Sequence, residues 1–201
     1  MKALEPQLWV LTGPMKSGKS DLLIQHARKR QEEGIRVSAF KPSTDTRDIE
    51  IKSRSGLEID CQQVHPQLGA TSIRFAVLAH EPHTVILDEF QFMTSYDYIR
   101  LIQELVAKGY EVIIAGLDMT SDQEPFGLMP YAMCLADRVS KLQGWCENCT
   151  TEAHMTPSVL TFANFKKTDS VAVESEQATY LSVCRACWEQ LTHRMAQNSQ
   201  E

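Results

Sequence analysis

The sequence predicts an α/β fold with a mainly parallel β-sheet, helices on both faces and a small second domain. Apolar runs alternate with stretches of helical periodicity, a glycine-rich loop follows the first run, and short β-like segments begin near residue 140. Strands that alternate with helices form parallel sheets. We therefore expect a first domain over residues 1–140, a second over 141–195 and a frayed polar tail over 196–201.

The predicted elements follow one another as strand–helix units. The strands, largely apolar as in a sheet covered on both faces, are expected at Leu8–Thr12, Ile35–Phe40, Thr84–Leu87 and Glu111–Ala115. The helices are expected at Ser20–Glu33, Ser95–Lys108 and Leu128–Ala136. Gly34 and Gly109 stand where the first two helical patterns stop, as helix-ending glycines do. Residues 43–70 are polar and are expected to be irregular.

The charge balance limits the possible partners. The chain of 201 residues carries 20 Lys and Arg against 26 Asp and Glu, a formal net charge of −6. This charge gives no general attraction to nucleic acid or to an anionic membrane, and it disfavours a nucleic-acid-stimulated ATPase. The sequence also lacks the ~18 continuous apolar residues of a membrane span and the features of a signal peptide. We expect a cytoplasmic protein without nucleic-acid or membrane partners.

Residues 13–20 read GPMKSGKS and match the phosphate-loop pattern GxxxxGK[ST] in full. The glycines let backbone N–H groups turn toward phosphate oxygens, aided by the positive end of the following helix. Lys19 would reach the β- and γ-phosphates of ATP, and the Ser20 hydroxyl would bind Mg²⁺. The residues expected to form this site are Gly13, Pro14, Met15, Lys16, Ser17, Gly18, Lys19 and Ser20. The motif predicts a P-loop NTPase-like sheet.

An acidic pair, Asp88 and Glu89, follows the predicted strand Thr84–Leu87. Parallel α/β sheets place their chemistry at the carboxyl ends of strands. Asp88 is therefore the candidate for holding Mg²⁺, directly or through water. Successive strand residues point to opposite sides, so Glu89 has a different role and could act as a general base; the alternative is a solvated acid.

Four of the six cysteines form two CxxC pairs, Cys146 with Cys149 and Cys184 with Cys187. Four thiolates in two close pairs suit tetrahedral, structural Zn²⁺, although a redox dithiol is the rival interpretation of a single CxxC. The second domain is thus expected to be a small zinc ribbon, with Trp145 and Trp188 packed over the metal site. The two remaining cysteines, Cys61 and Cys134, are expected to be small buried hydrophobes.

The order of several motifs resembles the zinc-containing, type II thymidine kinases over nearly the whole chain. These motifs are GPMKSGKS, FKPSTDTR at 40–47, DEFQF at 88–92, GLD at 116–118, EPFG at 124–127 and LADRVSKL at 135–142, followed by the CxxC pairs. The resemblance implies transfer of the γ-phosphoryl group of ATP, with Mg²⁺, to the 5′-hydroxyl of thymidine or a related pyrimidine deoxynucleoside. It also implies a homotetramer and feedback by the triphosphate product.

The same resemblance implies roles for individual residues. Glu89 is expected as general base and Arg47 as a catalytic residue, and Asp45 and Gln91 are expected to assist Ser20 and Asp88 at the magnesium ion. The nucleoside pocket is expected to contain Met15, Phe92, Leu117, Ser121, Phe126 and Tyr180.

The chain departs from the family pattern in its nucleoside pocket and phosphate loop. Ser121 replaces a stacking aromatic residue, and the loop over the base reads ESEQAT at 174–179, without the family's glycines. Lys16 and Asp21 also differ, and we expect these two charges to offset one another near the phosphates. The alternative function is a divergent ATP-binding relative that has lost or changed its nucleoside specificity and acts as a regulatory or binding module.

Overall fold

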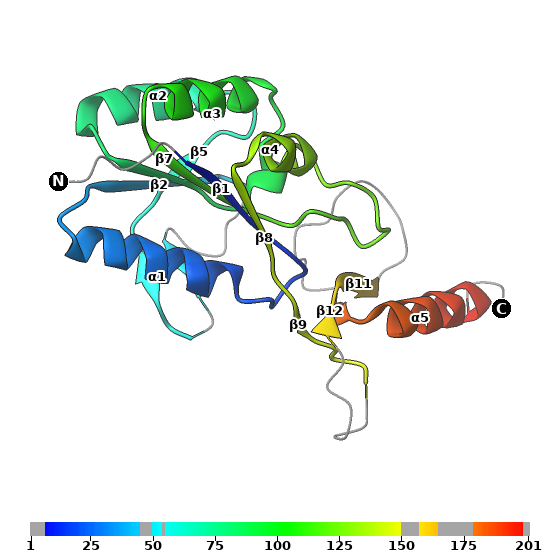
Figure 1. Cartoon of the computed structure of the whole chain (residues 1–201). Coiled ribbons are helices and arrows are strands. Elements are labelled where there is room, and N and C mark those ends of the chain that lie inside the picture. The colour runs from blue at the N-terminus through cyan, green and yellow to red at the C-terminus, as the bar shows by residue number, and fades with distance from the viewer. Residues whose placement is uncertain (1–6, 45–49, 54, 150–156, 165–178, 199–201) are drawn as a thin grey trace.

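The computed structural model describes residues 7–44, 50–53, 55–149, 157–164 and 179–198. Its main feature is a six-stranded sheet in the order β5–β2–β6–β7–β1–β8 (Figure 1). Every neighbouring pair in this sheet is parallel, which confirms the predicted fold class. The strands are β1 (Leu8–Thr12), β2 (Val37–Pro42), β5 (Gln62–Val64), β6 (Thr84–Leu87), β7 (Glu111–Ala115) and β8 (Arg138–Lys141).

Helices cover both faces of this sheet. One face packs against α1 (Lys19–Glu32) and the short hairpin of β3 (Ile51–Lys52) and β4 (Glu58–Ile59), whereas α2 (Gly69–His80), α3 (Asp97–Ala107) and α4 (Met129–Leu135) cover the other (Figure 1). Alternate strand residues serve the two layers, so Val10 belongs to the core under α2 and α3 while its neighbour Leu11 packs on the α1 side. The central strands β1, β6 and β7 are buried on both faces and are therefore largely apolar.

The predicted strands β1, β6 and β7 have the predicted bounds, and α1, α3 and α4 lie within a residue or two of theirs. The prediction that residues 43–70 are irregular is wrong in part, because β3, β4 and β5 lie there. β5 is a three-residue edge strand with two exposed glutamines, which leaves little apolar signal. α2 was not predicted either, since Phe75 and Leu78 stay about two-thirds exposed and blur its helical pattern.

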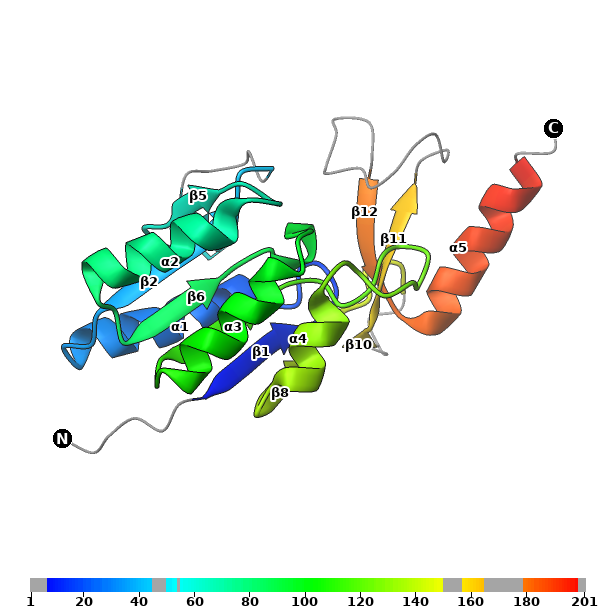
Figure 2. The same cartoon turned by 90° about the horizontal axis from the view of Figure 1, so that it is seen from above.

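The last strand of the main sheet crosses the predicted domain boundary. β8 pairs with β1 from Arg138 to Lys141 and so ends one residue beyond position 140. After it come two antiparallel pairs, β9 (Gly144–Trp145) with β10 (Pro157–Ser158) and β11 (Leu160–Asn164) with β12 (Thr179–Val183). We call β9–β12 with the two CxxC pairs the cysteine ribbon. Figure 2 shows β11 and β12 beside the carboxyl end of β1.

The final helix, α5 (Arg185–Asn198), extends past the predicted start of the tail at residue 196. Leu191 and Met195 pack against the core of the cysteine ribbon, so one face of the helix is anchored almost to its end. α5 therefore includes residues 196–198, which were predicted to belong to the tail. Within the described ranges, no helix combines the length and apolar character that a membrane crossing needs.

The two isolated cysteines are less buried than predicted. Cys134 is exposed on the outer side of α4, whose inward residues are Met129 and Ala132, and Cys61 is half-buried just before the edge strand β5. Trp145 is also exposed, at 59%, so the expectation that it packs over the metal site is wrong. Trp188 does pack against the ribbon core.

Candidate active site and metal centre

The candidate residues gather at the carboxyl ends of the parallel strands. The phosphate loop, residues 13–20, follows β1, while Asp88 and Glu89 follow β6. β7 lies between β1 and β6 in the sheet, so the segment after β7 emerges between these two groups. That segment, residues 117–126, is called the nucleoside loop here because it holds three of the predicted pocket residues. Parallel pairing alone therefore brings three distant parts of the sequence to one edge.

The phosphate loop has the backbone that its glycines predict. Gly13 has φ 134°, and a Cβ atom there would lie 2.3 Å from the carbonyl oxygen of Leu142. Gly18, with φ 84°, precedes the first residue of α1, so the helix begins at Lys19 as the motif requires. The Lys19 ammonium donates hydrogen bonds to the carbonyl oxygens of Gly13 (3.0 Å) and Pro14 (2.8 Å), which places the cation over the loop.

Lys16 and Asp21, whose charges are expected to offset one another near the phosphates, each have a partner in another segment. The Lys16 ammonium forms an ion pair with Glu147, which stands between two cysteines of the ribbon. The Asp21 carboxylate accepts a hydrogen bond from the hydroxyl of Ser55, which lies between β3 and β4. Each of the two charges thus has its own partner on a different side of the loop.

Asp88 and Glu89 differ in backbone conformation. Asp88 is 7% exposed. It remains hydrogen-bonded to the neighbouring strand β2, because its N–H donates to the carbonyl oxygen of Phe40 (2.9 Å). Glu89 has φ 49° and ψ 40° and begins the short 3₁₀ helix η1 (Phe90–Phe92). A non-glycine residue in this left-handed region stores strain, which concentrates at functional sites. β6 thus ends just before Asp88, and the left-handed turn begins at Glu89.

Gln91 connects this acidic pair to the nucleoside loop. Its amide nitrogen donates to the Glu89 carboxylate (2.5 Å), and its amide oxygen accepts the N–H of Leu117 (3.0 Å). The side chain is 2% exposed, and a Cβ atom on Gly116 would lie 2.6 Å from its oxygen. Both ends of the Gln91 amide are thus held by the protein, an arrangement that the expected magnesium contact did not predict.

The nucleoside loop folds back on itself and contacts the ribbon. Met119 pairs with Pro125 in an isolated β-bridge, and the N–H of Phe126 donates to the carbonyl oxygen of Asp118 (3.0 Å). The ring of Phe126 meets that of Phe92 edge to face at 5.5 Å, so two predicted pocket residues are in contact. No local sequence pattern predicts the ring contact itself, which arises from the folded loop.

Ser121, another predicted pocket residue, is held from the ribbon side. The indole N–H of Trp188 in α5 donates to the Ser121 carbonyl oxygen (3.0 Å). Asp118 is 8% exposed and forms an ion pair with Lys141 at the end of β8 (2.5 Å). Neither Trp188 nor Lys141 was predicted to hold this loop, because their partners lie far away in the sequence.

Met15 is held by β11 and β12, and β12 also carries Tyr180. The Met15 carbonyl oxygen accepts a hydrogen bond from the Ser182 hydroxyl, and the Met15 N–H donates to the Thr161 hydroxyl (3.3 Å). Tyr180 precedes Ser182 by two positions on β12, so both side chains project from the same face of the strand. This face is the one that meets the phosphate loop.

Several expected site residues lie outside the described residues. These are Asp45 and Arg47, together with the ESEQA segment at 174–178. β2 ends at Pro42 on the same sheet edge as the phosphate loop, so the chain that leads to Asp45 starts from the active-site side.

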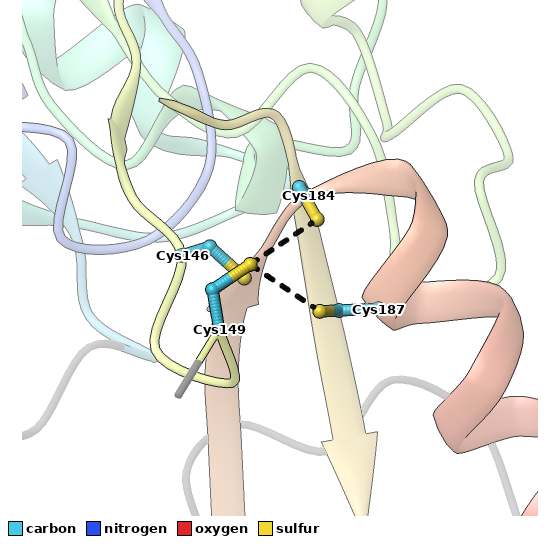
Figure 3. A group of neighbouring side chains, drawn as sticks. All are labelled: Cys146, Cys149, Cys184 and Cys187. Atoms are coloured by element: carbon cyan, nitrogen blue, oxygen red, sulfur yellow. Dashed lines mark hydrogen bonds between the residues drawn. The ribbon is translucent and has the colours of Figure 1, made fainter. Parts of the chain in front are cut away.

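The four ribbon cysteines converge on one point (Figure 3). All four sulfur atoms lie within 4.8 Å of one another, with Cys149 Sγ 3.9 Å from Cys184 Sγ and 3.6 Å from Cys187 Sγ. A tetrahedron of Zn–S bonds of about 2.3 Å requires sulfur atoms about 3.8 Å apart. The cluster therefore fits Zn²⁺, and four protein ligands leave no open position for a substrate.

The thiols of this cluster differ in acidity. Burial raises the pKa of Cys187 to about 12. Burial acts in the same direction at Cys146, but hydrogen bonds from the backbone of Cys184 and Asn148 outweigh it and lower the pKa to about 7. Backbone N–H groups thus favour a thiolate at Cys146, and a bound metal would displace the remaining protons.

A parallel α/β sheet with a phosphate loop after β1, an acidic pair after β6 and a four-cysteine ribbon places the chain in the class of P-loop α/β proteins. Comparison with known proteins narrows this class. The family model described as thymidine kinase matches residues 6–188. Thymidine kinases of Mesomycoplasma hyopneumoniae strains 7448 and J are each 33% identical over 180 residues, which is 89% of this chain and 92% of theirs.

The chain belongs to the thymidine kinase family. It is accordingly an enzyme of the deoxynucleoside kinase class.

Proposed function

We propose that the protein transfers the γ-phosphoryl group of ATP to the 5′-hydroxyl of a deoxynucleoside, with thymidine or a related pyrimidine deoxynucleoside as substrate. The observation that carries this proposal is the Gln91 bridge, which joins the acid after β6 to the nucleoside loop after β7. Through this bridge the buried Gln91 side chain would align the general base, Glu89, with the loop that would hold the acceptor nucleoside.

In the proposed reaction Glu89 accepts the proton of the 5′-hydroxyl as its oxygen attacks the γ-phosphorus. The bond from the γ-phosphorus to the bridging oxygen breaks, and ADP leaves with that electron pair. Lys19 and the backbone N–H groups of residues 13–20 would balance the negative charge on the phosphates. Such catalysis depends mainly on positioning and charge stabilisation, for which the strained turn at Glu89 and its bond to Gln91 are suited.

Ser20 and Asp88 are the proposed magnesium-holding residues, with Asp45 as a third. The Ser20 hydroxyl and the Asp88 carboxylate supply the oxygen ligands that Mg²⁺ prefers. When bound, the ion would neutralise charge on the β- and γ-phosphates. Arg47 is proposed to stabilise charge on the transferred group, as the family pattern at DTR implies.

The two aromatic rings of Phe92 and Phe126 support a nucleoside pocket beside the acidic pair, because stacked or edge-packed rings offer a surface for a planar base. Met15, Leu117 and Tyr180 are proposed to complete it. Ser121 contributes a small side chain where family members carry an aromatic one, so room for a base substituent is the expected consequence. This favours 5-substituted deoxyuridines as additional substrates.

The four cysteines are proposed to hold one structural Zn²⁺, which would connect the first CxxC pair, Cys146 and Cys149, to the start of α5. We also propose the division into a nucleotide domain at 1–140 and a ribbon domain at 141–195, a homotetramer, and a cytoplasmic location. The family pattern supports the tetramer, and the charge and hydropathy of the sequence support the location.

The test is a phosphorylation assay with Mg²⁺ and ATP across thymidine, deoxyuridine, 5-substituted deoxyuridines, deoxycytidine and purine deoxynucleosides. Glu89→Gln protein is the control, because it keeps the shape of the site and removes the base. We expect turnover of thymidine or a close relative, and a loss of at least about 100-fold in the control, with ATP binding intact. Turnover that survives in Glu89→Gln would refute the role of Glu89, and ATP binding without turnover of any nucleoside would favour a binding module.

A further inference from the structure

An ion pair joins the phosphate loop to the cysteine ribbon. Its cation is Lys16, at a position that the phosphate-loop pattern leaves open, and its anion is Glu147, which lies between Cys146 and Cys149. The two side chains are 29% and 31% exposed, so solvent screens the pair only in part. The two residues are 131 positions apart in the sequence, and the contact therefore exists only in the folded chain.

Glu147 is fixed by β12 on its other side. Its second carboxylate oxygen accepts the N–H of Ser182 (2.6 Å), and its own backbone N–H donates to the Ser182 carbonyl oxygen (2.8 Å). Most surface ion pairs are weak because two long side chains must be immobilised. Here the anion is already immobilised by the backbone, so that cost is reduced at Glu147.

The ribbon also holds the residue next to Lys16. Ser182 donates its hydroxyl to the Met15 carbonyl oxygen, and the Thr161 hydroxyl accepts the Met15 N–H (3.3 Å). Close packing adds to this, since a Cβ atom on Gly144 would lie 3.2 Å from the Lys16 carbonyl oxygen. Two successive residues of the phosphate loop are thus held by the ribbon through backbone and side chain.

Lys16 needs such support because of its backbone. It has φ 61°, a left-handed conformation that is unfavourable for an L-residue with a long side chain. The loop can present its N–H groups to phosphate only while it keeps this shape. External contacts that hold Lys16 and Met15 therefore prepare the loop before ATP arrives.

We propose that Glu147 is a positioning residue for ATP binding: its carboxylate holds Lys16, and the cysteine ribbon thereby sets the affinity of the phosphate loop for ATP. The inference rests on the proposed function, because it assumes that ATP phosphates bind residues 13–20. In this proposal the cysteine ribbon determines nucleotide affinity in addition to supporting the fold. The competing outcome is that ATP phosphates and Glu147 compete for Lys16, in which case removal of Glu147 would strengthen binding.

The test is a double-mutant cycle with Glu147→Gln, Lys16→Met and the double variant. Calorimetry without nucleoside gives the Kd of Mg²⁺–ATP, and kinetics gives the KM of thymidine. Each single variant should raise the Kd of ATP about fivefold, and the double variant should raise it no further, because either change alone breaks the pair. The KM of thymidine should stay within about twofold, and the zinc content should remain about one per chain.

The matched control is Glu81→Gln, which neutralises the partner of Arg36 in an exposed ion pair of 3.6 Å. It should leave the Kd of ATP unchanged. If Glu147→Gln lowers zinc content, Ser182→Ala replaces it, since that variant keeps every charge and removes the hydroxyl that holds Met15; it should weaken ATP binding about threefold.

An unchanged or lower Kd in Glu147→Gln with normal zinc, or effects that multiply in the double variant, would overturn the proposal. An unchanged Kd in Ser182→Ala, where that variant is used, would do the same. If the wild-type chain itself does not bind ATP, the proposed function fails at an earlier step. The two failures are therefore distinguishable.

Discussion

The amide nitrogen of Gln91 donates a hydrogen bond to the carboxylate of Glu89, although the two residues are separated by only one position in a tight 3₁₀ turn. The opposite end of the same amide accepts the N–H of Leu117. A buried amide with both ends engaged fixes the rotamer of its neighbours, so Glu89 has a defined direction before any substrate binds.

Replacement of Gln91 by Glu should slow the reaction without impairing ATP binding. The new carboxylate can still accept the Leu117 N–H, but it places a second negative charge beside Glu89 and removes the donor. We expect kcat to fall about tenfold at neutral pH and the acidic limb of its pH profile to move to higher pH, because the ionised base is disfavoured. Steady-state kinetics across pH measures both effects. A uniform loss of kcat at every pH would mean that Gln91 has a packing role only.

The cysteine cluster should carry about one zinc per chain. Cys187→Ser should lower the zinc content well below one and destabilise the ribbon, since a structural site needs its four ligands. The matched control is Cys134→Ser, which changes a cysteine outside the cluster. Elemental analysis of native protein and both variants decides between the outcomes. A disulfide in place of metal would support the redox interpretation.

Trp188→Phe should affect the nucleoside more than ATP. The substitution keeps an aromatic ring in the ribbon core and removes the indole N–H that holds the Ser121 carbonyl oxygen. We expect the KM of the nucleoside to rise about three- to tenfold, with the KM of ATP unchanged. Trp145→Phe, at a tryptophan that is 59% exposed, should change neither. Equal increases of both KM values would show a general loosening of the ribbon.

Ionisation of Glu111, at the start of β7, should make the free energy of unfolding depend on pH. Burial opposes its ionisation, but hydrogen bonds from His26, Arg30 and Thr84 outweigh burial and lower its pKa from 4.5 to about 2. The folded pKa is depressed, so this stabilisation is present above about pH 4.5 and is lost as the pH falls toward 2.

Glu111→Gln should therefore reduce the free energy of unfolding at pH 7 by about 3 kcal/mol, and the difference from the wild type should shrink below pH 4.5. Denaturant unfolding at several pH values measures it. Glu104→Gln is the control, because Glu104 forms a solvent-exposed pair with Arg74 and should change little. A pH-independent difference would exclude ionisation of Glu111 as the cause.

The sequence predicted those parts of the fold whose signal is local. β1, β6 and β7 are continuous apolar runs, and the phosphate loop is set by residues within eight positions of one another. α2 was not predicted because its exposed face carries Phe75 and Leu78, so apolar residues occur around the whole helix. β5 was not predicted because a short edge strand needs few apolar residues.

The candidate site was predictable as a set of motifs but not as a set of contacts. Lys16 and Asp21 illustrate the difference, since the sequence analysis treated their charges only in relation to the phosphates, whereas their partners Glu147 and Ser55 come from other segments. Trp188 and Ser121 likewise meet only because α5 and the nucleoside loop converge. Side-chain pairing at long range depends on tertiary geometry, which no local pattern encodes.

The place of β7 between β1 and β6 also bears on how substrate preference can change. Two interstrand steps separate β1 from β6, a distance of roughly 10 Å that backbone hydrogen bonds maintain. Side chains such as Ser121 on the intervening loop can vary without altering that spacing. In the proposed function, the spacing between the phosphate loop and the acidic pair therefore does not depend on the side chain at position 121, and a change there can alter nucleoside preference while the phosphate-transfer geometry is kept.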